Sequence, residues 1–417
     1  MSLSGPGKNS PHTQDCQHFF KKKCGGCSFL HIPYADQLAA KQQQVAGMLQ
    51  STFRSLSGRK KPDLKAVMRD IVPSHLAMGY RASAKFTLHE DKSGRKTVGL
   101  FTQGTRTVVS TTGCPANSEL VNKLTQALFA NIADTDLKCF DHSSTTFQKN
   151  RLKYLTIRTS PSTGTMAHQT AIIISHTGID KQALIKWIEA TGLDQLCAYE
   201  SRLTKEDGEA LMGRQSKHLS GPKTFPYLLT DRTFRISPVS FFQANHSLAA
   251  DLIKCATSFQ KKGDILLDLY GGFGAYSFAI KDIFNEIIVV DGNPAAIQAA
   301  HAHAVDHGIT HLKAVNESCE TYLEKRMPLE TANRITHLIV NPSRTGMSVD
   351  VIKSISLETL PLLQELHYIS CSPPTFARDA LSLIGSGLTL TEVVPFDMFP
   401  QTDHVELVGK FMRAPIF

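Results

Sequence analysis

The sequence lacks any run of about 18 apolar residues, the length that a membrane-spanning helix requires. Its first 15 residues are rich in Ser, Gly, Pro and His and contain no apolar stretch typical of a secretory signal peptide. The nine cysteines are irregularly spaced along 417 residues, unlike those of a small secreted disulfide scaffold. No internal repeat is visible. These absences exclude a membrane span and predict a cytoplasmic protein.

The composition is that of an ordinary globular chain with a basic excess. With 41% hydrophobic and 20% charged residues the chain can form hydrophobic cores, and its length predicts more than one domain. A formal net charge of +8 and a pI of about 8.9 point to a polyanionic partner such as nucleic acid. A solvated basic surface would produce the same excess, so charge alone does not identify the partner.

Three cysteines near the start form a metal-binding pattern. Seven residues separate Cys16 from Cys24, and two separate Cys24 from Cys27. Closely spaced thiolates can converge on zinc or on an iron–sulfur cluster, and both alternatives are open at this point. The fourth ligand must come from elsewhere, and Cys114, in a predicted turn after a strand, is the best candidate. A redox CxxC is disfavoured because no thioredoxin-like βαβ pattern surrounds it.

Short alternating segments between about residues 68 and 175 predict a mostly β domain. Helices are predicted over 34–53, near 117–131 and over 181–190, and a hairpin over 227–236. Within Gly79–Lys85 an aromatic residue, Tyr80, stands near two cations, Arg81 and Lys85. Such interleaving suits contacts to RNA bases and phosphates, although an exposed strand with solubilising charge fits equally.

Strands alternate with helices after residue 241, which predicts a doubly wound, parallel α/β sheet. The expected strands are 265–269, 286–290, 335–340 and 366–369. The predicted organisation is a disordered tail over 1–15, a cysteine segment with a helix over 16–66, a β-rich RNA-binding domain over 67–230 that contributes Cys114, and an α/β domain over 231–417.

A glycine-rich turn follows the first of these strands. Asp268 begins the pattern D-x-x-x-G-x-G, which ends with Gly272 and Gly274, and Asp291 follows at the next strand end. Glycines let the backbone approach a ligand, and the second acid can accept hydrogen bonds from ribose hydroxyls. The pattern lacks the G-x-G-x-x-G spacing that cradles a pyrophosphate. It therefore favours S-adenosylmethionine over a dinucleotide.

Polar residues at the later strand ends indicate the chemistry. Arg344, in Asn341-Pro-Ser-Arg, stands where amino-methylating enzymes have an aromatic residue, which argues against an amine acceptor. Cys371 follows the strand 366–369, and its thiolate could add to C6 of uracil so that C5 becomes nucleophilic. Glu406 is the candidate base for the C5 proton. The alternatives are that Cys371 is a buried hydrophobe and that Glu406 only holds a nearby loop in place.

These motifs resemble those of the RNA uracil-C5 methyltransferase family along nearly the whole chain. The matching segments are the cysteine pattern, Gly79–Lys85, Phe241–Asn245, Asp268–Gly274, Asn341–Gly346, Tyr368–Asp379 and Asp397–Glu406.

The resemblance implies a class I Rossmann-like S-adenosylmethionine methyltransferase domain. It implies a 4Fe-4S cluster held by Cys16, Cys24, Cys27 and Cys114. It further implies cofactor contacts from Gln243, Tyr270, Gly272, Gly274, Asp291 and Asn341, and RNA contacts from Arg81, Lys85 and Phe241. Cys371 takes the nucleophile position of the family, and Glu406 takes the proton-acceptor position.

Transfer-RNA members of the family lack the cluster, so the chain is similar to the ribosomal-RNA branch, and to its RlmC type. The implied product is 5-methyluridine in 23S rRNA. Ser343, Asp291 and Ser372 replace the residues usual in the family, which leaves the target nucleotide open. A cytosine-C5 RNA methyltransferase is one alternative. A catalytically silent RNA-binding iron–sulfur protein is another, but it would need neither Cys371 nor Glu406.

Overall fold

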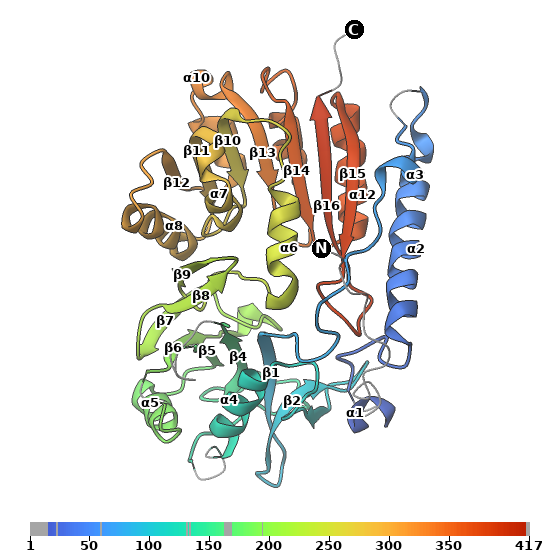
Figure 1. The fold of residues 1–417 in the computed structure, drawn as a ribbon. Coiled ribbons are helices and arrows are strands. Elements are labelled where there is room, and N and C mark those ends of the chain that lie inside the picture. The colour runs from blue at the N-terminus through green and yellow to red at the C-terminus, as the bar shows by residue number, and fades with distance from the viewer. Residues whose placement is uncertain are drawn as a thin grey trace. The chain divides into compact units, whose positions relative to one another are not determined.

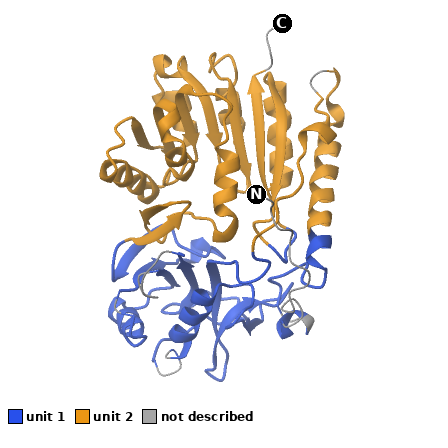
Figure 2. Cartoon of the chain, viewed as in Figure 1, with its two compact units in different colours: residues 1–37, 76–223, 400–403 blue, residues 38–75, 224–399, 404–417 orange. Residues whose placement is uncertain are grey.

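The computed structural model describes residues 16–21, 24–58, 61–130, 132, 135–161, 169–193 and 195–413, so the predicted tail over 1–15 lies outside the described residues. The chain divides into two compact units (Figure 2). Unit 1 comprises residues 1–37, 76–223 and 400–403, and unit 2 comprises residues 38–75, 224–399 and 404–417.

Unit 1 contains a mixed seven-stranded sheet with the strand order β3-β2-β1-β4-β5-β6-β7. Its strands are β1 (Ser83–Glu90), β2 (Lys96–Phe101), β3 (Val108–Ser110), β4 (Leu152–Thr159), β5 (Thr170–His176), β6 (Cys197–Arg202) and β7 (Ser216–Ser220). The central strands β4 and β5 are buried at every residue. Neighbouring strands are antiparallel except β5 and β6, which are parallel because helix α5 (Lys181–Glu189) joins them.

Two amphipathic helices supply the rest of the core of unit 1. Helix α4 (Glu119–Ala130) packs Val121, Leu124 and Leu128 into one hydrophobic cluster with Ile172 of β5 and Trp187 of α5. The Trp187 indole N–H also donates to the carbonyl of Leu128 over 3.0 Å. Unit 1 is therefore rich in β-structure, although the alternation of apolar residues did not reveal β6 and β7.

Unit 2 contains a seven-stranded sheet in the order β12-β11-β10-β13-β14-β16-β15 (Figure 1). The strands are β10 (Gly263–Leu269), β11 (Phe284–Asp291), β12 (Leu312–Asn316), β13 (Ile335–Val340), β14 (Glu365–Ser370), β15 (Leu388–Phe396) and β16 (Glu406–Arg413). The strands from β12 to β14 are parallel, whereas β16 is antiparallel to both of its neighbours. This is a mostly parallel, Rossmann-like sheet, so the predicted α/β fold class is confirmed. The antiparallel edge was not predicted.

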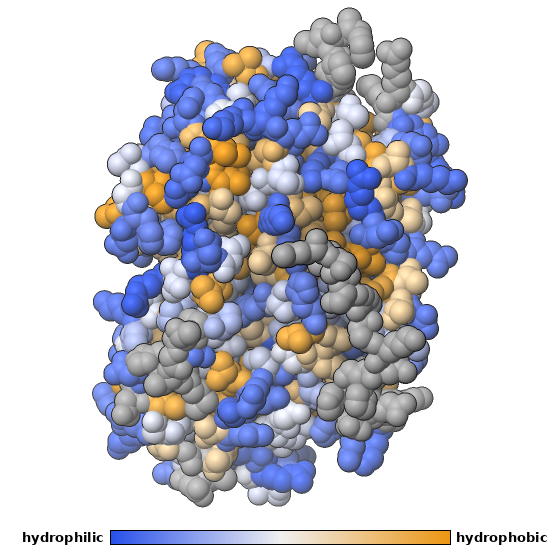
Figure 3. All heavy atoms as spheres, in the orientation of Figure 1, coloured by the Kyte–Doolittle hydropathy of each residue, from blue (hydrophilic) through white to orange (hydrophobic). Residues whose placement is uncertain are grey.

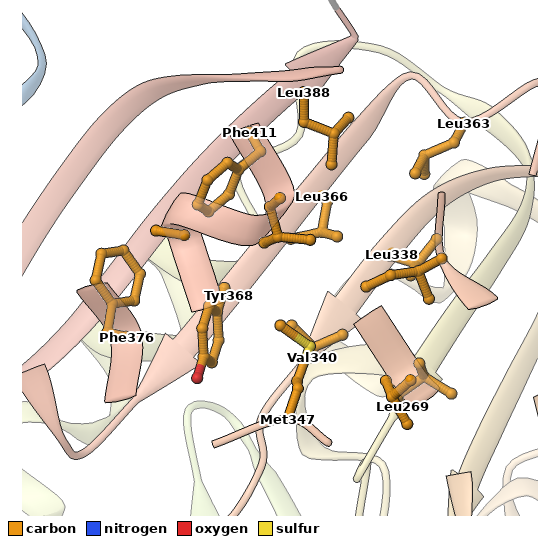
Figure 4. Packing of buried hydrophobic residues seen from close by; sticks show 14 of the residues in the cluster. Leu269, Leu338, Val340, Met347, Leu363, Leu366, Tyr368, Phe376, Leu388 and Phe411 are labelled. Atoms are coloured by element: carbon orange, nitrogen blue, oxygen red, sulfur yellow. The ribbon is translucent and has the colours of Figure 1, made fainter. Parts of the chain in front are cut away.

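Helices cover the sheet of unit 2. They are α3 (Leu64–Val67), α6 (His246–Ala256), α7 (Ala275–Ala279), α8 (Pro294–Asp306), α9 (Cys319–Thr321), α10 (Leu329–Ala332), α11 (Val349–Ser354) and α12 (Pro373–Gly385). Helix α2 (Tyr34–Thr52) begins in unit 1 and buries Val45 and Leu49 in the core of unit 2. Alternate strand residues such as Leu338 and Val340 belong to this core, where Tyr368 and Phe376 also pack (Figure 4). The hairpin predicted over 227–236 is formed by β8 (Phe225–Leu229) and β9 (Arg232–Ile236).

The face shown in Figure 3 is mostly hydrophilic, with hydrophobic side chains scattered across it. The most exposed large hydrophobic side chains of the described residues include Phe241, Val305, Leu329 and Val349. Within the described ranges, no helix is both long enough and apolar enough to cross a bilayer. A helix α1 (Gln17–Phe20) begins directly after Cys16.

Candidate active site and cysteine-lined cavity

Cys371 lies in the turn that joins β14 to α12. Strand β14 is buried along its whole length, and α12 begins with two prolines, Pro373 and Pro374. Proline suits the first turn of a helix, where the backbone N–H has no partner within the helix. The chain must therefore turn at residues 371 and 372, and the hydroxyl of Ser370 accepts the Ser372 N–H over 3.3 Å there. This geometry places the thiol at the carboxyl edge of the parallel strands.

Strand register brings Glu406 to the same place. Ser370 pairs with Leu407 in the antiparallel β14–β16 ladder. In an antiparallel pair, Cys371, which follows Ser370, is therefore opposite Glu406, which precedes Leu407. Burial raises the pKa of the Cys371 thiol, and the charge of Glu406 raises it further. The two side chains predicted to act as nucleophile and base are thus close enough to interact.

Arg344 is the third member of this group. Its positive charge lies near the Cys371 thiol and lowers the pKa that burial and Glu406 raise. A cation beside a thiol favours the thiolate, which is the reactive form. The sequence pattern identifies Arg344 only as a replacement for an aromatic residue and does not assign it to the nucleophile.

Glu406 is buried in a small polar network. Burial raises its pKa to about 7, against the opposing effect of a hydrogen bond with Gln243. Gln243 also hydrogen-bonds Tyr276, whose own pKa burial raises well above its ordinary value. A carboxyl group that titrates near neutrality is suited to take a proton and to return it. Gln243, expected at the cofactor, therefore lies beside the candidate base, and Tyr276 was not predicted at all.

The glycine-rich turn after β10 is tied to the end of β11. The backbone N–H of Gly272 donates to Asp291 Oδ2 over 2.9 Å, and the N–H of Asn293 donates to Oδ1 over 2.7 Å. Gly272 and Gly274 have φ angles of +58° and +82°, which favour glycine. A Cβ added to Gly272 would meet no atom within 4 Å, so a ligand can approach this backbone.

Asp268 lies beneath this turn with no exposed surface. Burial raises its pKa to about 7, the charge of Asp291 adds to this effect, and a hydrogen bond with Ser277 opposes it. Ser277 Oγ donates to Oδ2 over 2.6 Å, whereas Oδ1 is buried and has no hydrogen-bond partner in the part of the chain that the structure describes. An unpaired buried acceptor of this kind fits a ligand that brings a donor.

Asn341 and Tyr270 flank the same sheet edge. The Asn341 N–H donates to the carbonyl of Leu269 over 3.2 Å. Tyr270 has a φ of +58° and hydrogen-bonds Glu320, and burial raises its pKa well above its ordinary value. It lines a cavity of about 700 Å³ together with Arg378 and residues 345–349.

Helix α12 holds the loop that carries Arg344. The buried carboxylate of Asp379 accepts the Tyr368 hydroxyl over 2.8 Å and the Met347 N–H over 2.9 Å. Arg378 donates to the carbonyl of Thr345 over 2.9 Å. These contacts fix the loop after β13 next to the turn that carries Cys371.

The residues expected to contact RNA have different surroundings. Phe241 is 66% exposed, whereas the adjacent Phe242 is buried with its ring centroid 4.9 Å from that of Tyr227. Lys85 is an exposed residue of β1. Arg81 instead lines a cavity in unit 1 and hydrogen-bonds the Tyr80 hydroxyl over 3.3 Å.

That cavity, of about 250 Å³, is lined by all four predicted ligands, Cys16, Cys24, Cys27 and Cys114. None of these thiols forms a disulfide. Burial raises the pKa of Cys27 to about 12, the charge of Cys114 also raises it, and Arg81 lowers it. Among the described residues, no three His, Cys, Asp or Glu side chains form a group that could hold a metal ion as they stand.

Comparisons with known proteins find similarity to RNA methyltransferases. The sequence model described as tRNA (uracil-5-)-methyltransferase matches residues 228–414. The chain is 25% identical to an uncharacterized RNA methyltransferase of Synechocystis, over 92% of this chain and 79% of that protein. It is 26% identical to an uncharacterized RNA methyltransferase of Thermotoga maritima, over 96% of this chain and 84% of that protein.

One solved structure is similar over most of both chains. It is the Pyrococcus abyssi tRNA (uracil-54, C5)-methyltransferase in complex with S-adenosyl-L-homocysteine. The TM-score is 0.71, the sequence identity is 22%, and the match covers 93% of this chain and 86% of that chain. At this identity the likeness concerns the fold.

Proposed function

We propose that this protein belongs to the RNA uracil-5-methyltransferase family, whose sequence model matches residues 228–414, and that it methylates C5 of a uracil in RNA with S-adenosylmethionine as methyl donor. One observation carries the proposal: Cys371, Glu406 and Arg344 meet where β14 ends and β16 begins. Methylation of this carbon requires a nucleophile for C6 and a base for the C5 proton. Methylation of an amine would require no such nucleophile.

In the proposed reaction the Cys371 thiolate adds to C6 of uracil, and the resulting enolate makes C5 nucleophilic. S-adenosylmethionine, when bound, would supply the methyl group as an electrophilic carbon; its S–CH3 bond breaks as the C5–CH3 bond forms, and S-adenosylhomocysteine is the leaving group. C5 then carries both a methyl group and a hydrogen. Glu406 takes that proton, the C5–C6 double bond forms again, and the bond between C6 and Cys371 breaks to return the thiolate.

The charged groups around Cys371 suit both the addition of the thiolate to C6 and the later removal of the C5 proton. Arg344 favours the thiolate, whereas burial and Glu406 favour the neutral thiol, so Arg344 is the group that supports attack. With a pKa of about 7, Glu406 is ionised in a large fraction of molecules near neutral pH and can accept the proton. Gln243 would orient the carboxylate through its hydrogen bond.

We assign the methyl-donor site to the edge formed by Gly272, Gly274, Asp291 and Asn341, with Gln243 and Tyr270 nearby. Two observations support the fit of S-adenosylmethionine to this site. The backbone at Gly272 is open to a ligand, and Asp268 Oδ1 is a buried acceptor without a described partner. The amino group of S-adenosylmethionine would supply a donor at this edge, and its ribose hydroxyls could donate to Asp291.

The four cysteines of unit 1 are proposed to hold a 4Fe-4S cluster. Their thiols share one cavity with Arg81, whose positive charge would offset the negative charge of four thiolates. Sulfur ligands of a single zinc ion lie within about 4 Å of one another, because each bond to zinc is about 2.3 Å long. A cluster of several atoms tolerates wider spacing. The shared cavity and the family resemblance support the cluster, and a single zinc ion is the alternative that metal analysis tests.

The RNA target is proposed to be 23S ribosomal RNA. The choice rests on the resemblance, which implies a cluster at the cysteine cavity and the ribosomal branch. Transfer RNA is the alternative target, because the similar solved structure is a tRNA (uracil-54, C5)-methyltransferase. Phe241 and Lys85 are exposed and are proposed to contact RNA. Arg81, also expected at the RNA, is proposed to act mainly at the cysteine cavity that it lines.

Nucleoside analysis tests the proposal. The protein is incubated with S-adenosylmethionine carrying an isotopically labelled methyl group and with unmodified transcripts of 23S rRNA or tRNA. The RNA is then digested to nucleosides for mass spectrometry. We expect labelled 5-methyluridine from 23S rRNA. Labelled 5-methylcytidine would overturn the choice of base, label in tRNA alone would overturn the ribosomal target, and label in neither RNA would favour a silent binding protein.

A further inference from the structure

Helix α2 carries two buried polar side chains that lie one turn apart. Gln37 and Lys41 have no exposed surface, whereas Gln43 on the same helix is exposed. Burial of a polar group costs free energy unless its donors and acceptors find partners. Lys41 contacts Asp397 and Phe399, and Gln37 contacts Gln401, all in the segment 397–405 that connects β15 to β16. The Gln37 amide also donates to the carbonyls of Phe29 and Ile32.

This connection ends at the proposed general base. It closes the β15–β16 hairpin, in which Phe396 pairs with Glu406. Residue 397 therefore follows the partner of Glu406 directly, and residue 405 precedes Glu406 itself. Whatever holds the connection in place also determines where β16 begins, because the chain is covalently continuous.

Lys41 holds the first part of the connection. Its Nζ lies 2.5 Å from Asp397 Oδ1, and it donates to the carbonyl of Phe399 over 3.1 Å. Asp397 is fully buried as well, and its backbone N–H donates to the carbonyl of Val72 over 3.0 Å. A buried charge without its partner is strongly unfavourable, so the ion pair restricts the connection to this arrangement.

Gln37 holds residue 401. Its side-chain oxygen accepts the Gln401 N–H over 3.0 Å, and its NH₂ group donates to Gln401 Oε1 over 2.9 Å and to the carbonyl of Ile32 over 2.8 Å. The N–H groups of Ser28 and Phe29 donate to the Gln401 carbonyl. Gln401 has a φ of +67°, which a residue other than glycine adopts only when its surroundings impose it.

We propose that Gln37 and Lys41 are positioning residues that hold the 397–405 connection so that Glu406 can take the C5 proton. The inference rests on the proposed function, because Glu406 needs this placement only for proton removal. Neither residue reaches the thiol, so addition of Cys371 and methyl transfer continue without them. Removal of either contact slows the last step, and RNA remains covalently bound to the enzyme.

The test compares Gln37→Met with Gln43→Met. The first change removes the buried amide at similar side-chain volume, and the second makes the same change at an exposed position of the same helix. Each variant is mixed with RNA and labelled S-adenosylmethionine and analysed on denaturing gels. We expect Gln37→Met to form methylated adduct at nearly the wild-type rate but to release RNA roughly tenfold to a hundredfold more slowly. Gln43→Met should match the wild type.

A second variant covers the case in which Gln37→Met does not fold. The double change Lys41→Met with Asp397→Leu replaces the buried ion pair by apolar side chains, a change that often preserves stability. This variant should also accumulate adduct. Wild-type release rates in both folded variants would overturn the proposal.

Glu406→Gln, measured in parallel, separates this inference from the proposed function. If Glu406→Gln traps RNA but the helix variants do not, the positioning role alone is wrong. If Glu406→Gln traps no RNA and the wild type produces no 5-methyluridine, the proposed reaction is wrong and the inference fails with it.

Discussion

The guanidinium of Arg344 lies near the thiol of Cys371 and lowers the pKa of that thiol. The two residues follow β13 and β14, which are neighbouring parallel strands, so both side chains come from the same edge of the sheet. Burial and the charge of Glu406 raise the pKa of Cys371, and Arg344 opposes them. The reactivity of this cysteine therefore depends on a residue distant from it in the sequence.

Arg344→Gln should make Cys371 a poorer nucleophile. Loss of the cation raises the thiol pKa, so alkylation of Cys371 by iodoacetamide, followed by mass spectrometry, should require a higher pH. The methylation rate should fall by roughly tenfold or more. Arg326→Gln is the matched control, because the Arg326 side chain is 67% exposed. If the pH dependence of alkylation is unchanged in Arg344→Gln, then Arg344 does not lower the pKa of Cys371.

Glu406→Gln should trap RNA on the enzyme. Methyl transfer from S-adenosylmethionine can proceed, but no base removes the C5 proton, so a covalent adduct should appear as a slow band on denaturing gels. The adduct should disappear in the double variant with Cys371→Ala, because no bond to C6 can form. A lower rate without trapped RNA would instead assign Glu406 a purely structural role.

Release of methylated RNA by the wild type should depend on pH near neutrality. Burial raises the pKa of Glu406 to about 7, and only the ionised form accepts a proton. The release rate should therefore rise as the pH increases through about 7 and then level off, as measured by the decay of labelled adduct. A rate that is constant from below to well above pH 7 would contradict the assignment of the base.

Cys24→Ser should remove the proposed cluster. Anaerobically purified wild-type protein should contain about four iron and about four sulfide per chain, whereas the variant should lose both and its brown colour. Unit 1 should unfold at a lower temperature, because the cluster would link Cys114 to the segment of Cys16–Cys27. Cys255→Ser is a suitable control, since Cys255 lies on α6 of unit 2. A colourless wild-type protein with one zinc ion would contradict the cluster.

Stability should fall in mild acid because several histidines are buried. Burial lowers the pKa of His142, His246, His303 and His337 to about 4 in each case. The pKa of a histidine in the unfolded chain is about 6.5. Between this pH and the lower folded-state pKa, the unfolded chain binds protons that the folded chain does not. Each group therefore favours folding above about pH 6.5, and this contribution is lost as the pH falls towards 4.

Urea unfolding at pH 7, 6 and 5 measures this effect. Each histidine should contribute at most about 1.4 kcal/mol per pH unit. His246→Phe should reduce the pH dependence, because His246 packs against Tyr227 and Phe242 and an aromatic ring can replace it. An equally steep loss of stability in this variant would mean that His246 does not contribute.

Local patterns in the sequence predicted much of unit 2. Buried apolar runs that end in polar residues identified β10, β11, β13 and β14 to within a few residues, because strand burial and termination depend on nearby side chains. The helix predicted over 34–53 is observed as Tyr34–Thr52. Cys371 could be predicted as the nucleophile because it follows β14, and Glu406 could be predicted as the base because it begins a strand near the end of the chain.

The pairing of distant segments was decided only by the tertiary structure. Nothing in the local pattern of β16 states that it inserts antiparallel between β14 and β15, since that choice depends on packing against both neighbours. This insertion is what places Glu406 opposite Cys371.

The sequence by itself thus predicted Cys371 as nucleophile and Glu406 as base, and it determined most of the strands of unit 2, because patterns of burial and termination are local. The tertiary structure alone decided which side chains meet. It brought Arg344 to Cys371, Arg81 to the four cysteines, and Gln37 to Gln401. The physical reason is that hydrogen bonds and ion pairs between buried groups form only after the hydrophobic cores have fixed the relative positions of the elements.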